Sequence, residues 1–430
     1  MNMLFVMDSL SCVAGANVNI VRTLNRRFKD KNCKIYVLSK HDCRRPASGN
    51  LMREFDEAFL LPADEMEIIP DLHERLGATK KNAREAIWFM NHPGIFLKGI
   101  DGKFGNGFIT IRAYKKEIEK LCRERSIDAV IGVSAPYNIA RAVSLSDINA
   151  VKALYQMDPY TNNYTMSERT KEKRRQTERR TIERLDVIFM PDFIREDIIK
   201  EKVYSDSTKY VEANLPGIII GDMSVEKHTA EKKKDPNEIC FVFAGKMYED
   251  IRNPEPLLQL FERLPDHYKL HILGAGCEKV VNKYKEALGT RLVYHGLVSK
   301  AEADGYTNSA DILVNIDNTI RNQMPSKILD YINSRKQIIN ICSDCDCLAA
   351  KMLLQYSNGL NVPFNEKSLT ENAEMVKNFV SRGRKELSSD EILATYYKYT
   401  DKYVADVIYN TLVRMKSDDG ENEERGNTDG

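Results

Sequence analysis

Short apolar runs alternate with longer stretches of helical periodicity through most of the chain, in two successive series. Such runs are too short for helices and predict buried strands of a parallel sheet, joined by the helices between them. The first series opens with a strand over residues 3–7, a loop over residues 8–15, a helix over residues 17–28 and a strand over residues 34–39. This order is the βαβ opening of an α/β domain.

The same alternation continues to the end of the second series, which is the more regular of the two. In the first series, further strands are predicted at residues 129–133, 152–155 and 187–190, with a charged helix over residues 167–185. The second series has predicted strands at residues 239–244, 269–273, 291–295, 311–315 and 337–341. Its predicted helices cover residues 254–264, 278–288, 300–309 and 326–333. The second half therefore predicts a doubly wound domain.

A chain of 430 residues is too long for one typical hydrophobic core, so two domains are expected. The predicted organisation is a first domain at 1–213, a linker at 214–237, a second domain at 238–388, a closing helical segment at 389–415 and a disordered acidic tail at 416–430. We expect the fold class to be α/β, with two tandem Rossmann-like doubly wound domains facing each other across a cleft.

The bulk composition excludes several classes of protein. The net charge of +1 does not indicate a nucleic-acid partner, and no apolar run approaches the ~18 residues of a transmembrane helix. The first residues lack the charged region of a signal peptide, and nine scattered cysteines suit reduced thiols in a cytoplasm. Cys342, Cys345 and Cys347 lack a second pair at zinc spacing, so small buried cysteines are favoured over a metal site.

One segment near the predicted helix at 326–333 combines the groups that bind a nucleotide. Pro325 is placed near the first helical position, and Ser326 and Lys327 are placed in the first turn, where a hydroxyl, a cation and free backbone N–H groups suit a diphosphate. Asp330, one turn further on, suits the hydroxyl groups of a ribose. An ordinary capped helix that packs Ile328 into the core remains the alternative.

A second segment places two cations at the same edge of the predicted sheet. Lys246 and Arg252 follow the strand at 239–244, at the rim where Ser326 is expected. Together they would neutralise a diphosphate, and an arginine can do so with two parallel hydrogen bonds. Taken singly, each is better explained as a solvated surface charge.

These segments belong to a longer run of motifs in the second half of the chain. The run comprises Phe243-Ala-Gly-Lys246, Arg252, Pro256-Leu-Leu258, Leu270-His-Ile-Leu-Gly-Ala-Gly276, Val293-Tyr-His-Gly-Leu-Val298, Ala310-Asp-Ile-Leu-Val314, Pro325-Ser-Lys-Ile-Leu-Asp-Tyr331 and Gln337-Ile-Ile339. In this order it resembles the nucleotide-binding domain of GT-B glycosyltransferases, closest to glycosyltransferase family 4. The first half is similar more weakly, at Gly15-Ala16, Ser134-Ala-Pro136 and Tyr155-Gln-Met-Asp-Pro159. The glycine pair at Gly274-Ala-Gly276 lacks the third glycine of a dinucleotide fingerprint and is interpreted as a tight turn.

The resemblance implies roles for particular residues. Lys246 and Arg252 fall where the family has its diphosphate-binding basic pair. Gly15 would let the backbone approach the donor, and Leu297 and Val298 fall near the nucleobase contact.

Two positions depart from the family's Glu-x7-Glu motif. Asp330 replaces its second acid, which holds the ribose, and Asn322 stands at its first acid, which touches the donor sugar. An asparagine keeps hydrogen bonding but loses the charge, which puts the identity of the sugar, and the activity itself, in question.

The implied activity is transfer of a sugar from a nucleotide-sugar, the donor substrate, to a glycan or lipid-linked acceptor, with retention and without metal or other cofactor. Lys246 and Arg252 would stabilise the leaving diphosphate, and the pathway implied is synthesis of a surface polysaccharide. Asp158, at a strand end of the first domain, is a candidate acceptor contact, and a helix-capping or turn aspartate is the alternative.

Two further segments are compatible with a peripheral contact at the inner face of a membrane. They are the apolar and glycine-rich stretch at residues 93–114 and the basic helix at residues 169–184, each of which also fits an ordinary covering element. The competing interpretations of the whole chain are a nucleotide-sugar epimerase and a non-catalytic protein that binds nucleotide or sugar.

Overall fold

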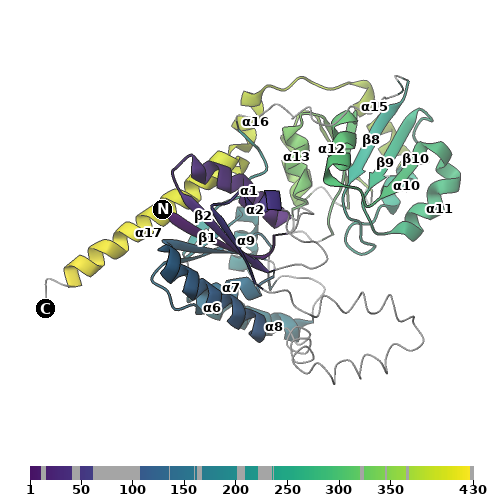
Figure 1. Ribbon diagram of the computed structural model, residues 1–430. Coiled ribbons are helices and arrows are strands. Elements are labelled where there is room, and N and C mark those ends of the chain that lie inside the picture. Colours follow the sequence, from purple (N-terminus) through teal and green to yellow (C-terminus); the bar gives the residue numbers. More distant parts are fainter. Residues whose placement is uncertain are drawn as a thin grey trace, which may run out of the picture. The chain divides into compact units, whose positions relative to one another are not determined.

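The computed structural model describes residues 1–10, 16–40, 49–61, 107–134, 136–158, 160–161, 167–200, 209–220, 235, 237–319, 324–343, 346–364 and 368–426. The chain divides into two compact units. Unit 1 is Met1–Leu215 together with Lys402–Gly430, and unit 2 is Pro216–Asp401. Each unit is built around its own parallel sheet (Figure 1).

Unit 1 contains a seven-stranded parallel sheet in the order β3-β2-β1-β4-β5-β6-β7. The strands are β1 (Asn2–Ser9), β2 (Lys34–Lys40), β3 (Glu57–Leu61), β4 (Ala129–Val133), β5 (Val151–Tyr155), β6 (Val187–Met190) and β7 (Tyr210–Glu212). The helices of the same unit are α1 (Ala16–Lys29), α2 (Gly49–Met52), α6 (Phe108–Arg125), α7 (Asn138–Leu145), α8 (Glu168–Ile182) and α9 (Asp192–Lys200). The β1-α1-β2 opening expected from the sequence is present.

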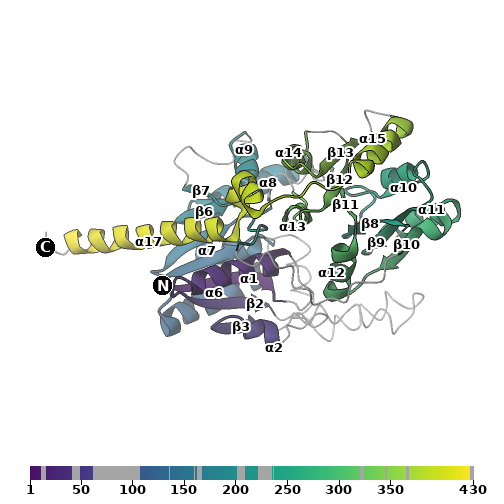
Figure 2. The same cartoon turned by 90° about the horizontal axis from the view of Figure 1, so that it is seen from above.

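Alternate side chains of the strands in unit 1 serve its two faces, as the two-residue period of a strand requires. Leu4 and Val6 of β1 face the core cluster that α6 and α7 share. Phe5, between them, points the other way and packs on Phe28 of α1, with ring centroids 6.0 Å apart. Helices therefore cover both faces of this sheet (Figure 2).

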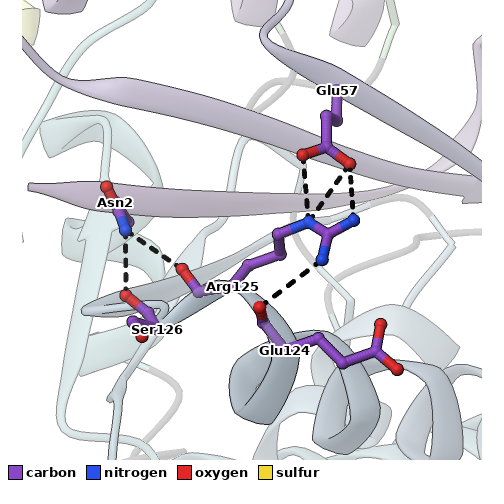
Figure 3. A network of polar contacts seen from close by, with 5 residues as sticks. All are labelled: Asn2, Glu57, Glu124, Arg125 and Ser126. Atoms are coloured by element: carbon purple, nitrogen blue, oxygen red, sulfur yellow. Dashed lines mark hydrogen bonds and ion pairs between the residues drawn. The ribbon is translucent and has the colours of Figure 1, made fainter.

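A polar network ties the end of α6 to the amino edge of this sheet (Figure 3). The guanidinium of Arg125 donates from Nε and Nη2 to the carboxylate of Glu57 on β3, at 2.9 to 3.1 Å. The side-chain amide of Asn2 donates to the carbonyl groups of Arg125 and Ser126, at 3.0 and 3.1 Å. Because ligands of open α/β sheets bind at the opposite, carboxyl edge, we assign this network a structural role.

Unit 2 contains a six-stranded parallel sheet in the order β10-β9-β8-β11-β12-β13. The strands are β8 (Ile239–Ala244), β9 (Tyr268–Leu273), β10 (Leu292–Gly296), β11 (Ile312–Ile316), β12 (Gln337–Cys342) and β13 (Gly359–Pro363). The helices are α10 (Glu255–Phe261), α11 (Glu278–Leu288), α12 (Lys300–Ser309), α13 (Lys327–Asn333), α14 (Leu348–Leu354), α15 (Leu369–Ser381) and α16 (Ser389–Tyr396). Two 3-10 turns, η3 (Gly289–Arg291) and η4 (Tyr397–Tyr399), follow α11 and α16.

Helices α10, α11 and α15 pack on one face of this sheet in a single core cluster. Helices α12, α13 and α14 contact strands of the sheet and form the layer on its other face (Figures 1 and 2). The expected fold class, two tandem Rossmann-like domains, is confirmed by the two doubly wound parallel sheets. The cleft expected between them stays a prediction.

The chain passes back from unit 2 to unit 1 at its final helix, α17 (Asp401–Gly426). The sequence analysis expects one helical segment at 389–415, whereas α16, η4 and an extended Thr400 precede α17. Thr400 forms a parallel bridge with Ile218 instead. The helix then continues to Gly426, past residue 416 where a disordered tail is expected, because extending a formed helix costs little.

Packed side chains and ion pairs attach α17 to unit 1. Its buried apolar residues are Val404, Ala405, Ile408 and Leu412. Lys31 pairs with Asp406 at 2.6 Å and lies over the Tyr409 ring, and Lys416 pairs with Asp128. Within the described ranges, no helix is long and apolar enough to cross a membrane.

Candidate functional site

The loop after β8 carries the two cations that the sequence analysis places at this rim. Tyr248 and Arg252 form an antiparallel bridge, in which Arg252 N donates to Tyr248 O at 2.9 Å and Tyr248 N donates to Arg252 O at 3.2 Å. This bridge closes the loop that separates Lys246 from Arg252. Lys246 is exposed, and its Nζ lies 4.9 Å from the centre of the Tyr248 ring. The ammonium is therefore held near Arg252 while remaining open to a ligand.

Arg252 is half-buried and is oriented by the loop after β11. Its Nε and Nη2 both donate to Oδ1 of Asn318, at 3.1 and 2.8 Å. Burial lowers the pKa of the Arg252 guanidinium, and the charge of Asp317 opposes that change. One edge of the guanidinium is thus occupied by Asn318, and its Nη1 remains near the carbonyl of Lys246 at 3.4 Å.

Ser326 immediately precedes α13 and contributes a hydroxyl. It is exposed and its side chain makes no hydrogen bond to the helix backbone, so the hydroxyl is not used as a cap. The sequence predicts Ser326 inside the helix, with Pro325 near the first helical position. Instead α13 begins at Lys327 and has 7 residues, so we assign the local charge to side chains rather than to the dipole of this short helix.

Lys327 adds a third cation beside the two loop residues. The surrounding protein removes water from its ammonium and so lowers its pKa, while the charges of Asp330 and Asp304 raise it. Its side chain is nevertheless exposed, so water screens the group and limits that effect.

These groups line one pocket at the carboxyl edge of the unit 2 sheet, with a volume of about 140 Å³. The lining residues are Phe243, Ala244, Gly245, Lys246, Arg252, Asn315, Pro325, Ser326, Lys327 and Tyr331. This volume is below the roughly 300–1,000 Å³ of sites that enclose a drug-sized ligand. The pocket therefore suits a phosphate-sized group of a larger ligand, whose other parts would lie on the rim.

Two glycines allow the loop after β9 to approach the cationic loop. Gly274 has a φ of 140°, and a Cβ there would lie 1.9 Å from the carbonyl oxygen of Gly245. Gly276 has a φ of 102°, and its Cβ would lie 2.2 Å from the carbonyl oxygen of Met247. Both positions fit the interpretation as a tight turn. The two carbonyl groups that they approach belong to the residues on either side of Lys246.

Asp330 lies on α13, one turn after Lys327, but does not line the pocket. The surrounding protein raises the pKa of its carboxyl to about 6, with Lys327 and Lys300 opposing. Its side chain is exposed by its surface area, so water screens the carboxyl and the effect of the raised pKa on stability is small.

The remaining predicted residues lie elsewhere. Leu297, 76% exposed, and the half-buried Val298 follow β10 in unit 2, outside the pocket lining. Asp158 follows β5 in unit 1, and nothing here relates it to the unit 2 pocket. Gly15 and Asn322 lie outside the described residues. Their roles stay predictions.

Three residues of the site were not predicted from the sequence. Asn315 and Tyr331 line the pocket, and Asn318 orients Arg252. Asn315 and Asn318 follow from one signal, since polar residues at the carboxyl end of a buried strand lie where α/β sheets bind ligands. Tyr331 is buried and lacks such a signal.

The cysteines considered as metal ligands are placed only in part. Cys342 and Cys347 are buried free thiols, and Cys347 accepts from the Ala350 amide at the start of α14, at 3.4 Å. Cys345 lies outside the described residues. Across the described ranges, no group of three or more His, Cys, Asp or Glu side chains could hold a metal ion.

No family model matches the chain. No curated protein matches it either. Solved structures do: the lipopolysaccharide outer core galactosyltransferase WaaB matches at 14% identity with a TM-score of 0.56, over 97% of this chain and 100% of that chain. Sucrose-phosphate synthase from Thermosynechococcus elongatus matches at 11% identity with a TM-score of 0.61, over 96% of this chain and 98% of that chain.

Anabaena HepE, in complex with UDP and glucose, matches at 10% identity with a TM-score of 0.61, over 96% of this chain and 100% of that chain. At these identities the likeness shows the fold, and it confirms the GT-B fold expected from the sequence motifs. Membership of glycosyltransferase family 4 stays a prediction.

Proposed function

We propose that the protein is a glycosyltransferase that moves a sugar from a nucleotide-sugar donor to a glycan or lipid-linked acceptor. The observation that carries the proposal is the convergence of Lys246, Arg252, Ser326 and Lys327 on one pocket at the carboxyl edge of the unit 2 sheet. Three cations and a hydroxyl are the groups that hold a diphosphate and stabilise it as it leaves. The fold of WaaB, sucrose-phosphate synthase and HepE supports the same assignment.

The proposed chemistry is transfer with retention and without a metal ion. As the bond between sugar and diphosphate breaks, negative charge develops on the leaving phosphate. Lys246, Arg252 and Lys327 would neutralise this charge, which is the task that Mg²⁺ performs in other enzymes. Arg252 is oriented for this beforehand by Asn318. A chelator should therefore leave transfer unchanged.

The proposed setting is the synthesis of a surface polysaccharide, in the cytoplasm. The named function of WaaB in lipopolysaccharide assembly supports this class of acceptor. The basic helix α8, with exposed residues such as Lys173, Arg179 and Arg180, suits a peripheral contact with anionic lipid. A nucleic-acid partner is not proposed, given the near-neutral chain.

The proposal is tested by thermal shift against UDP, ADP and GDP and their glucose and mannose conjugates. A ligand that binds the folded state raises the melting temperature, and the rise should fall when Lys246→Ala is tested with the same ligand. The ligand that binds is then offered without acceptor, and slow release of free sugar is expected. Absence of a shift with every ligand would argue for a protein without a nucleotide-sugar substrate.

A second candidate activity is epimerisation of a nucleotide-sugar. A Listeria monocytogenes protein named as a UDP-N-acetylglucosamine 2-epimerase matches with a TM-score of 0.55 at 11% identity, over 98% of this chain. The same incubation distinguishes the two, because an epimerase interconverts two nucleotide-sugars whereas a transferase releases the nucleotide. Binding with neither outcome would favour the non-catalytic alternative.

A further inference from the structure

Three asparagines on adjacent strands of unit 2 form a continuous chain of side-chain hydrogen bonds that ends at the pocket. Asn315 on β11 is paired in register with Asn340 on β12, which is paired with Asn361 on β13. Nδ2 of Asn315 donates to Oδ1 of Asn340 at 2.7 Å, and Nδ2 of Asn340 donates to Oδ1 of Asn361 at 3.1 Å. Nδ2 of Asn361 donates in turn to the carbonyl of Ala350 at 3.0 Å.

The far end of this chain determines the orientation of every amide in it. The carbonyl of Ala350 can only accept, so the amino group of Asn361 must face it. Its oxygen then faces Asn340, whose amino group must donate to it, and the oxygen of Asn340 requires the amino group of Asn315. The amino group of Asn315 is thus committed to Asn340, and its Oδ1 is the atom left to face the pocket that this residue lines.

At the pocket, the row of asparagine amides ends in a hydrogen-bond acceptor that lies among cations. Asn315 is 4% exposed, and among the described residues no group donates to its Oδ1. An ionised phosphate has only acceptor oxygens, so it cannot donate a hydrogen bond to this oxygen. A ligand that fills the pocket without leaving Oδ1 unpaired must bring a donor as well as a phosphate.

The donor is a hydroxyl of the transferred sugar, by elimination within a nucleotide-sugar. Its diphosphate has no donor. Its ribose hydroxyls are expected at Asp330 and its base near Leu297 and Val298, and none of these three residues lines the pocket. The sugar attached to the second phosphate carries several hydroxyl groups directly beside it. It is the part of the ligand that can reach both the cations and Asn315.

Resting on the function proposed above, we propose that Asn315 accepts a hydrogen bond from a hydroxyl group of the donor sugar. Asn340 and Asn361 act as positioning residues, since they keep the oxygen rather than the amino group of Asn315 toward the ligand. The site thereby prefers the intact nucleotide-sugar over the nucleoside diphosphate. This preference gives Asn315 a measurable signature that a purely structural asparagine lacks.

The test compares affinities for a nucleoside diphosphate and its nucleotide-sugar, using the pair that binds tightest in the screen above. In calorimetry, Asn315→Leu should weaken the nucleotide-sugar about tenfold and leave the nucleoside diphosphate unchanged. Asn361→Leu lies outside the pocket but frees the amides to rotate. It should weaken the nucleotide-sugar and tighten the nucleoside diphosphate several-fold, because Asn315 can then donate to a phosphate.

Asn372→Leu is the matched control, because Asn372 is a buried asparagine of α15 that donates to the carbonyl of Pro363. It should change the melting temperature without changing the ratio of the two affinities. If the wild type binds both ligands and Asn361→Leu leaves their ratio unchanged, the inference is wrong while the proposed function stands. If the wild type binds neither ligand, the proposed function fails first. Should Asn315→Leu not fold, Asn361→Leu alone decides the outcome.

Discussion

Oδ1 of Asn318 accepts two hydrogen bonds from the guanidinium of Arg252, from Nε at 3.1 Å and from Nη2 at 2.8 Å. A single side chain at the end of one strand thus orients a cation on the loop after its neighbour. We expect Asn318→Ala to leave Arg252 charged but poorly oriented, and to weaken binding of a nucleoside diphosphate about three- to tenfold. Calorimetry measures this. An affinity equal to the wild type would mean that Arg252 needs no such support.

Lys246 is expected to contribute charge without contributing stability. Lys246→Ala should weaken a nucleoside diphosphate about tenfold, because it removes a charge-assisted contact from the pocket. Its melting temperature without ligand should stay at the wild-type value, since the side chain is exposed. Lys283→Ala removes another exposed lysine of unit 2 and is the control. It should leave the affinity for the nucleoside diphosphate unchanged. Equal weakening in both variants would indicate a general effect of net charge.

Asp330 predicts how binding depends on pH. Its pKa is raised to about 6, so lowering the pH through that value protonates the group that would accept from the ribose hydroxyls. Affinity for a nucleotide-sugar should fall below pH 6, by up to about tenfold per unit, because the ligand needs the charged form. The measurement uses a nucleotide-sugar and not a nucleoside diphosphate, because the terminal phosphate of a diphosphate titrates in the same pH range. Asp330→Asn should show weaker binding with no such dependence.

The same shift also predicts a sign for stability. A carboxyl whose pKa is raised on folding favours the folded state at low pH, and that contribution is lost as the pH rises through about 6. At pH 7 the Asp330→Asn variant should therefore melt no lower than the wild type. A clear loss of melting temperature would show that Asp330 serves the fold.

Gly274 should be among the least replaceable residues of unit 2. Gly274→Ala places a Cβ 1.9 Å from the carbonyl oxygen of Gly245, in a backbone conformation that favours glycine. We expect a loss of about 3 kcal/mol in the free energy of unfolding, measured in urea. Gly383→Ala is the control: its φ is 71° and no atom lies within 4 Å of the added Cβ, so about 1 kcal/mol is expected. Similar losses in the two variants would contradict the clash.

The alternation of apolar runs predicted the interior of both sheets well. The strands at β1, β2, β4, β5 and β6, and those from β8 to β12, match the predicted ranges within about two residues. All of these except β10 lie inside a sheet, where parallel strands are apolar on both faces. The strands missed were β3, β7 and β13, and all three lie at sheet edges. Edge strands are half-buried, as the pattern of β3 and β7 shows, and so lack a continuous apolar run.

The cations of the pocket were predictable because their position after a strand places them at the carboxyl edge. The chain of amide hydrogen bonds that ends at Asn315 was not. Asn315, Asn340 and Asn361 lie far apart in the sequence, and only the register between β11, β12 and β13 aligns them. Strand register depends on long-range pairing, which a single sequence does not reveal. The amide chain therefore needed the structure.

Unit 1 is made from two separate pieces of the chain, whereas unit 2 is one continuous piece whose ends meet at the bridge between Ile218 and Thr400. During synthesis the ribosome releases Pro216–Asp401 before α17, so the nucleotide-side unit can complete its fold while the other still lacks its last helix. The apolar surface that α17 covers with Val404, Ile408 and Leu412 stays open until that helix has been made and has packed. The unit that is begun first is therefore completed last.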